Sequence, residues 1–212
     1  MSDDLTIVLT AIHDDLEAAW RSVCGDLPNV EIHRGDIFAT AADAVVSPAN
    51  SFGFMDGGID AIYTRVFGRG VQTRLQARIR ERHFGELLVG AADIVETGHA
   101  SIPYVIAAPT MRVPMILRDT VNAYLAARAV LILIAAGRFD DGAPIRARVR
   151  RVAFPGLGTG VGQVPAELCA RQVRAAIEDI TLGQRRFPET WHDAQTRHQR
   201  LFRDRVWDLQ RG

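Results

Sequence analysis

The feature that most constrains the fold is a short apolar strand that runs into a glycine-rich loop and then into a helix. The loop, within Ala153–Gly162, has a glycine at every second position from Gly156 to Gly162. Glycine lacks Cβ, so such a loop can turn through positive φ and bring backbone N–H groups against a ligand. Pro165 lies near the first turn of the helix that is predicted next. A helix N-terminus at this place suits a phosphate, although a plain tight turn between strand and helix has the same pattern.

Two familiar phosphate-binding loops do not fit this spacing. The pattern is G-x-G-x-G-x-G rather than the G-x-G-x-x-G of dinucleotide-binding folds, and no lysine follows it as in the Walker A loop. All 25 basic residues of the chain are arginine. No lysine is therefore available for a P-loop, a kinase site or a Schiff base.

Apolar strands and amphipathic helices alternate along residues 1–183. Strands are predicted over 5–12, 30–33, 43–50, 92–98, 104–110 and 151–154, and helices over 13–23, 59–67, 71–82, 118–136 and 165–180. The second half of the helix at 118–136 is apolar nearly all round, which indicates burial against a sheet. The alternation predicts one three-layer α/β/α domain, with ligands expected at the carboxyl ends of its strands.

Residues 184–212 differ in character from the rest of the chain. Seven arginines surround apolar residues at roughly helical spacing, namely Trp191, Ala194, Leu201, Phe202 and Leu209. We interpret this segment as an amphipathic helical extension packed on the domain. A helix that contacts a partner or a nucleic acid remains an alternative, because Arg and Trp dominate such surfaces.

Charge and cysteine content limit the surroundings and partners of the protein. With 25 basic and 25 acidic residues the net charge is zero, so neither general nucleic-acid binding nor binding to an anionic membrane is expected. Cys24 and Cys169 lie far apart, which favours a reduced, cytoplasmic location over a disulfide framework. The acidic start Met1–Asp4 and the short apolar run Ala129–Ala136 lead us to expect no signal peptide and no membrane span. The oligomeric state is not determined by the sequence.

Metal and covalent chemistry have little support. The six histidines show neither H-x-H nor H-E-x-x-H spacing, and the chain has no G-x-S-x-G motif. Neither cysteine lies in a recognisable nucleophile context. We therefore expect no metal ion, no cofactor and no covalent nucleophile.

Three polar residues lie where predicted strands or loops end. Asp36 can accept a hydrogen bond from an exocyclic amine such as adenine N6, or can cap a helix. Asn50 suits ribose hydroxyls, or can form a turn. Asp60, two residues after Gly58, can act as a base or orient a water, or can simply pair with a helix dipole. Each alternative stays open on the sequence alone.

Four segments in order resemble the signature of macrodomains, the Appr-1''-p processing family. They are Gly35–Ile37, Ala44–Asn50, Asp56–Asp60 and Ala153–Gly162, and the resemblance spans about residues 30 to 182. It implies a mixed β-sheet between helices, with an ADP-ribose cleft formed by two loops at the edge of the sheet.

The resemblance also implies a role for each residue that matches the motifs. Asp36 would bind adenine N6, and Ile37 would make a backbone contact in the adenine pocket. Asn50 would face the distal ribose. The first diphosphate loop would be Gly57, Gly58 and Ile59, and the second would be Gly158, Thr159, Gly160, Val161 and Gly162, which would donate backbone N–H groups.

Asp60 carries the implied chemistry. In hydrolytic, MacroD-type macrodomains similar to this chain, a Gly-Gly-Val-Asp run places an aspartate beside the distal ribose, and Gly57–Asp60 keeps that aspartate in register. The implied activity is hydrolysis of mono-ADP-ribosyl esters or a related ADP-ribose derivative, by a water that Asn50 and Asp60 orient. Departures from the pattern are Ser47-Pro48 in place of Asn-Ala, Asp56 in place of glycine, and Tyr63 in place of histidine. A non-catalytic reader of ADP-ribosylated macromolecules and an interaction module that acts through the C-terminal helix are the alternatives.

Overall fold

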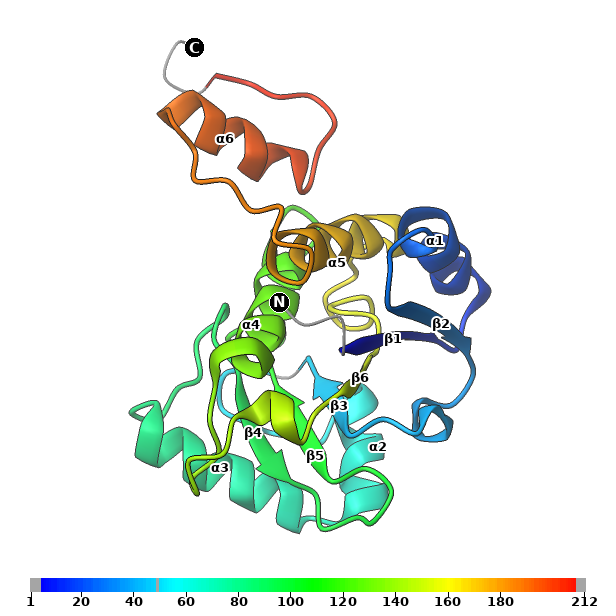
Figure 1. The fold of residues 1–212 in the computed structure, drawn as a ribbon, viewed down its shortest axis with the longest axis vertical. Coiled ribbons are helices and arrows are strands. Elements are labelled where there is room, and N and C mark those ends of the chain that lie inside the picture. Colours follow the sequence, from blue (N-terminus) through cyan, green and yellow to red (C-terminus); the bar gives the residue numbers. More distant parts are fainter. Residues whose placement is uncertain (1–4, 49, 209–212) are drawn as a thin grey trace.

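Strands and helices alternate along the chain in the computed structural model, which describes residues 5–48 and 50–208 (Figure 1). The predictions that concern Met1–Asp4, Ala49 and Leu209 lie outside the described residues. The strands are β1 (Thr6–Ala11), β2 (Val30–Arg34), β3 (Ala44–Ser47), β4 (Asp93–Glu96), β5 (Tyr104–Ala107) and β6 (Arg151–Phe154). The helices are α1 (Asp14–Cys24), α2 (Gly58–Phe67), α3 (Gly70–Arg82), α4 (Asn122–Ala136), α5 (Ala166–Ile180) and α6 (Trp191–Arg200), with short 3-10 turns η1 (Ile37–Thr40) and η2 (Ile145–Ala147).

The six strands form one mixed sheet in the order β2-β1-β6-β3-β5-β4. All neighbouring strands are parallel except β4, which runs antiparallel to β5. The central strand β6 pairs with β1 on one side and β3 on the other, with Ala153 opposite both Val8 and Val45. The mixed central sheet that the resemblance implies is therefore confirmed.

Helices cover both faces of the sheet, and alternate residues of β1 show how. Helices α1, α4 and α5 lie on one side of the sheet, and α2 and α3 lie on the other (Figure 1). Ile7 and Leu9 belong to the core cluster of the first group, whereas Val8 belongs to the cluster of the second. Successive side chains of a strand point to opposite faces, so an uninterrupted apolar strand serves two cores. This arrangement is the α/β/α sandwich expected from the alternation of elements.

Helix α4 begins at Asn122, four residues after the predicted start at Arg118. Thr120 accounts for the difference, because its hydroxyl donates to the carbonyl of Leu117 at 2.9 Å and accepts from the backbone N–H of Asn122 at 3.4 Å. These local bonds hold residues 117–121 in a turn. The turn brings Leu117 beside the second glycine loop, where its N–H donates to Gly162 O at 2.8 Å.

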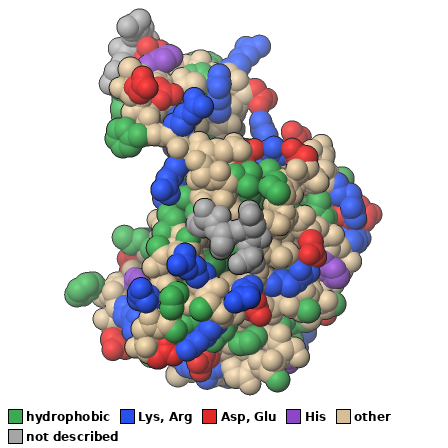
Figure 2. Space-filling view, in the orientation of Figure 1, with side chains coloured by type: hydrophobic (Ala, Val, Ile, Leu, Met, Phe, Trp, Pro, Cys, Tyr) green, Lys and Arg blue, Asp and Glu red, His purple; other side chains and the backbone are tan. Residues whose placement is uncertain are grey.

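Residues 184–208 extend away from the domain beyond the end of α5 (Figures 1 and 2). Arg171 of α5 pairs with Asp204 at 2.7 Å, and Gln172 donates to the carbonyl of Leu201 at 3.2 Å. Phe202 is partly buried against the main core cluster. Trp191 is exposed, and the buried residues of α6 are Gln195 and Gln199. Contact with the domain therefore runs mainly through the turn that follows α6, and the division of the chain into domain and extension stays a prediction.

No helix among the described residues is long and apolar enough to cross a membrane.

Candidate functional site

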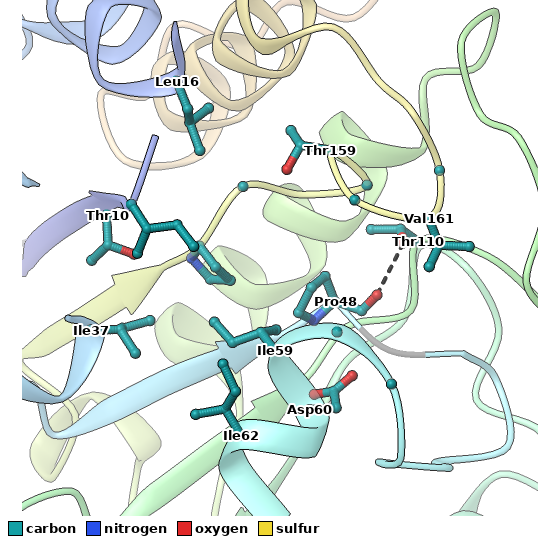
Figure 3. Close-up of a pocket in the computed structure, with 18 of the residues that line it drawn as sticks. Thr10, Leu16, Ile37, Pro48, Ile59, Asp60, Ile62, Thr110, Thr159 and Val161 are labelled. Atoms are coloured by element: carbon teal, nitrogen blue, oxygen red, sulfur yellow. Dashed lines mark hydrogen bonds between the residues drawn. The ribbon is translucent and has the colours of Figure 1, made fainter. Parts of the chain in front are cut away.

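A cavity of about 510 Å³ opens at the edge where the parallel strands end (Figure 3). Parallel strands bring their carboxyl ends to one edge of a sheet, so the loops after β1, β3, β5 and β6 meet there. All twelve predicted site residues line this cavity, namely Asp36, Ile37, Asn50, Gly57, Gly58, Ile59, Asp60, Gly158, Thr159, Gly160, Val161 and Gly162. Figure 3 shows Ile59 and Thr159, one from each glycine loop, on opposite sides of the space. Their roles toward a ligand remain predictions.

The second glycine loop presents a row of backbone donors to the cavity. The N–H groups of residues 158–162 have no acceptor within 5–48 and 50–208, whereas the neighbouring Gln163 and Val164 donate to Gly160 O and Gly158 O. Gly158 has φ +71°, which L side chains rarely adopt. Helix α5 begins at Ala166, with residues 163–165 between the loop and the helix. Loop and helix N-terminus together give this side of the cavity a positive potential without a charged side chain.

The glycines of this loop differ in what surrounds them. A Cβ on Gly156 would lie 2.4 Å from Thr159 Oγ1, and one on Gly162 would lie 2.6 Å from Gly158 O. A Cβ on Gly160 would meet no atom within 4 Å. Gly156 and Gly162 are therefore required by the packing of the protein, whereas the free space at Gly160 belongs to the cavity.

The first glycine loop is also the N-terminus of a helix. Gly57 is the N-cap of α2, and Gly58 begins the helix with φ +54°. A Cβ on either glycine would meet nothing within 4 Å. The unpaired N–H groups of a first helical turn carry a partial positive charge. Each wall of the cavity thus offers backbone donors suited to an anion.

Asp36 and Ile37 form the end of the cavity next to β2. Asp36 Oδ1 accepts from the backbone N–H of Phe38 at 3.0 Å, so this residue does cap the short turn η1. A carboxylate has several acceptor positions, and the side chain is exposed, so the cap leaves room for a second donor. Ile37 is buried and supplies an apolar wall.

Asp60 is a buried carboxyl group in the first turn of α2. Its side chain is held by Ser47, whose hydroxyl donates to Asp60 Oδ1 at 2.5 Å, and the residue is only 6% exposed. Burial raises the pKa of Asp60 to about 7, the bond from Ser47 opposes that rise, and the negative charge of Asp56 adds to it. A carboxyl group with such a pKa exists in both protonation states near neutral pH, which is the property of a general base.

Asn50 is occupied by its own loop. Its Nδ2 donates to the carbonyl of Phe54 at 2.9 Å, and its Oδ1 accepts from the backbone N–H groups of Phe52 at 3.1 Å and Phe54 at 3.3 Å. The turn-forming alternative is therefore realised in this structure. One hydrogen of the amide is left for a ligand.

Tyr63 lies beneath the site rather than in it. Its hydroxyl donates to Val46 O at 3.0 Å and it is fully buried. Burial first, and then the charge of Asp60, raise the pKa of Tyr63 well above its usual value, so the phenol stays protonated. Tyr63 thus links α2 to β3 and does not line the cavity.

Several lining residues were not found from the sequence. After β1 they are Ile12, His13 and Leu16, and after β5 they are Thr110, Met111 and Pro114; Phe54 joins them from the loop after β3. Both strands were predicted, and the rule that ligands bind at carboxyl ends of parallel strands would have pointed to these loops. Thr110 also ties two loops together, because its hydroxyl donates to Pro48 O at 3.0 Å (Figure 3).

Within the described part of the chain, no group of three or more His, Cys, Asp or Glu residues is placed to hold a metal ion. Among the described residues that line the cavity, the charged side chains are acidic and none is an arginine.

Known proteins resemble this chain in sequence and in fold. It is 32% identical to an uncharacterized protein of Aquifex aeolicus (strain VF5) over 152 residues, which is 72% of this chain and 81% of the relative. Its fold matches the macrodomain of Mycobacterium tuberculosis DarG with a TM-score of 0.56 and 20% identity, over 69% of this chain and 88% of the other. It also matches a mutant of the Oceanobacillus iheyensis macrodomain with ADPR, with a TM-score of 0.56 and 15% identity, over 83% and 78% of the two chains.

The family model described as Macro domain matches residues 46–173, which is more than half of the 212-residue chain and includes both glycine loops. With this match, the relative in Aquifex aeolicus and the shared fold, the chain belongs to the Macro domain family.

Proposed function

We propose that the cavity binds ADP-ribose. The observation that carries the proposal is that two sets of backbone donors, in loops 57–59 and 158–162, face one cavity from opposite walls. A diphosphate between these loops would accept from both sets, with adenine toward Asp36 and the distal ribose toward Asn50 and Asp60. The Oceanobacillus iheyensis macrodomain with ADPR, which has the same fold, supports this choice of ligand.

Calorimetric titration with ADP-ribose tests the proposal. We expect micromolar binding by the wild type, and loss of binding in Asp36→Ala and Gly160→Glu. The glutamate would place a negative charge in the free space beside Gly160. Gln184→Glu adds the same charge at an exposed site outside the lining of the cavity and is expected to bind as the wild type does. Folded wild-type protein that does not bind ADP-ribose contradicts the proposal.

We further propose that the protein hydrolyses mono-ADP-ribosyl esters or a related ADP-ribose derivative. Asp60 would accept one proton from a water, and the oxygen of that water would bond to the ester carbon as the bond to the leaving oxygen breaks. The products are ADP-ribose and the carboxylate of the carrier, and Asp60 then returns its proton to solvent. The buried position of Asp60 and its pKa near 7 support this role. In this proposal Asn50 orients the reacting ribose with its remaining amide hydrogen.

Substitution of Asp60 separates catalysis from binding. We expect Asp60→Ala to abolish turnover of an ADP-ribosyl ester while it keeps the affinity for ADP-ribose within roughly tenfold, about 1.4 kcal/mol. Asp60→Asn, which keeps the shape and the partner for Ser47 but cannot accept the proton, should behave in the same way. Release of ADP-ribose, followed by chromatography, measures turnover. Unchanged turnover in both variants would exclude the catalytic role.

A non-catalytic reader of ADP-ribosylated partners is the second candidate. The observation that favours it is the occupied amide of Asn50, which bonds to its own loop at both ends. A reader would bind ADP-ribose and an ADP-ribosylated carrier but would release no ADP-ribose from the wild type. The same turnover assay therefore decides between the two candidates.

A further inference from the structure

The rim of the cavity near Asn50 carries five apolar side chains that reach solvent, which we call the apolar collar. They are Phe54, Val113, Met115, Ile116 and Val161, and each is between 47% and 58% exposed. Phe54 and Val161 also line the cavity, so the collar continues from its interior to the surface. Large apolar side chains grouped around an opening mark a surface that another molecule covers.

Hydrogen bonds hold the three loops of the collar side by side. Asn50 forms a parallel bridge with Met111, and the N–H of Ser51 donates to Arg112 O at 3.2 Å, which joins the loop after β3 to the loop after β5. On the other side, Leu117 N–H donates to Gly162 O at 2.8 Å, which joins that loop to the second glycine loop. The three loops that carry the collar are thus joined to one another through their backbones.

The charges around the collar argue against a phosphate-rich carrier. Arg112 is paired with Glu86 at 2.7 Å and lies over the ring of Phe52 at 5.2 Å. Arg118 is held by a hydrogen bond to the neutral side chain of Gln163, which fixes the guanidinium but leaves its charge in place. Asp56, which lines the cavity near this rim, is exposed and acidic. A nucleic-acid strand binds through cations that are free to neutralise its phosphates, and the cavity lining contains none among the described residues.

We propose that the apolar collar docks the polypeptide that carries the ADP-ribose, through apolar side chains next to the modified residue. The inference rests on the proposed function, since it assumes that the distal ribose lies toward Asn50. The bond from the distal ribose to its carrier then leaves the cavity across the collar. Apolar flanking residues would remove the collar from water, which strengthens binding in proportion to the area covered.

Two non-hydrolysable mono-ADP-ribosyl peptides test the proposal, one with leucine and one with serine on both sides of the modified residue. We expect the wild type to bind the leucine peptide at least roughly tenfold more tightly, as the burial of two such side chains permits. The double variant Met115→Glu/Ile116→Glu should bind both peptides equally. Its affinity for free ADP-ribose should not change, because neither residue lines the cavity.

The matched control replaces two exposed aromatic residues of the C-terminal extension, Phe187→Glu/Trp191→Glu. It should keep the full preference for the leucine peptide. Equal binding of both peptides by the wild type overturns the proposal, as does loss of the preference in the control pair. Tighter binding of an ADP-ribosylated single-stranded oligonucleotide than of either peptide overturns it as well.

Two further outcomes are distinguishable from these. A wild type that does not bind free ADP-ribose refutes the proposed function itself, whereas binding of ADP-ribose without any peptide preference refutes only the docking role.

Light scattering of the wild type and of Met115→Glu/Ile116→Glu measures the oligomeric state and supplies the remaining check. A dimer that Met115→Glu/Ile116→Glu converts to a monomer would assign the collar to contact between copies of the chain and would overturn the proposal.

Discussion

The first glycine loop (residues 57–59) and the second glycine loop (residues 156–162) both place glycines at the cavity, but the surroundings of these glycines differ. In the second loop, added Cβ atoms at Gly156 and Gly162 would lie within 3 Å of protein atoms, and only Gly160 faces open space. In the first loop, Gly57 and Gly58 both face open space. The second loop is therefore constrained largely by internal packing, whereas the first is constrained by the positive φ of Gly58 (+54°) and has open space beside both of its glycines. A glycine-rich sequence alone does not reveal which reason applies at which position.

The largest effect is expected at the packed position of the second loop. In Gly162→Ala the new Cβ would lie 2.6 Å from the backbone oxygen of Gly158 and 2.8 Å from Leu117, so the loop must move. We expect the free energy of unfolding to fall by roughly 1 to 3 kcal/mol and ADP-ribose binding to be lost. Urea unfolding and calorimetry measure the two effects. If both are unchanged, packing does not define this loop.

Substitutions at Gly57, which faces open space in the first loop, should change the affinity for ADP-ribose without changing the free energy of unfolding. Gly57 is the N-cap of α2, a position where Asp and Asn are both favourable. The free energies of unfolding of Gly57→Asp and Gly57→Asn should therefore both lie within about 0.5 kcal/mol of the wild-type value. Only the aspartate adds a negative charge where we place the diphosphate. We expect it to weaken ADP-ribose binding roughly tenfold or more beyond the asparagine variant. Equal affinities of the two variants would place the phosphates away from this loop.

The smallest expected effect is that of pH on the free energy of unfolding, and we expect it to arise from Asp60, next to the first loop. Asp60 follows that loop with a pKa of about 7, against 3.8 for the unperturbed group, whereas residues 156–162 contain no titratable side chain. The folded protein holds a proton that the unfolded chain releases, so the stability this carboxyl contributes is complete below pH 3.8 and is lost as pH rises through 7.

The loss should amount to about 1 kcal/mol between about pH 6 and pH 8, and Asp60→Asn should remove it. Turnover of an ADP-ribosyl ester should change in the opposite direction, rising with pH through about 7, because the ionised carboxylate is the base. Thermal unfolding across this range, in wild type and variant, measures the first effect. If the stability of Asp60→Asn falls with pH as steeply as that of the wild type, the titrating group is not Asp60.

Much of the fold followed from local patterns. The six strands, the helices at 59–67 and 71–82, and the mixed sheet implied by the resemblance all occur, because apolar periodicity reports directly which side of a segment is buried. Helix α4 was placed four residues too early at its start, since a side-chain bond of Thr120 outweighed the helical propensity of the preceding residues. Element ends depend on such single bonds, which periodicity does not detect.

The candidate site was predictable as a set of residues but not as a chemical environment. All twelve predicted residues line one cavity, since each motif follows a strand that ends at the same edge. The bond between Ser47 and Asp60 joins residues thirteen positions apart, and the burial that raises the pKa of Asp60 comes from the helices and strands around it. The turn formed by Asn50 was one of two alternatives that the sequence left open, and the tertiary structure shows that this one is realised.

By itself, the sequence determined the alternation of strands and helices, the positions of both glycine loops and the family resemblance, because these depend on neighbours along the chain. Tertiary structure decided which glycines face open space, how far the pKa of Asp60 is raised, and that Phe54 and Val161, from separate loops, line one cavity and also reach solvent. The physical reason is that burial, close contact and the local dielectric depend on residues brought together from distant parts of the chain. No local pattern encodes those distances.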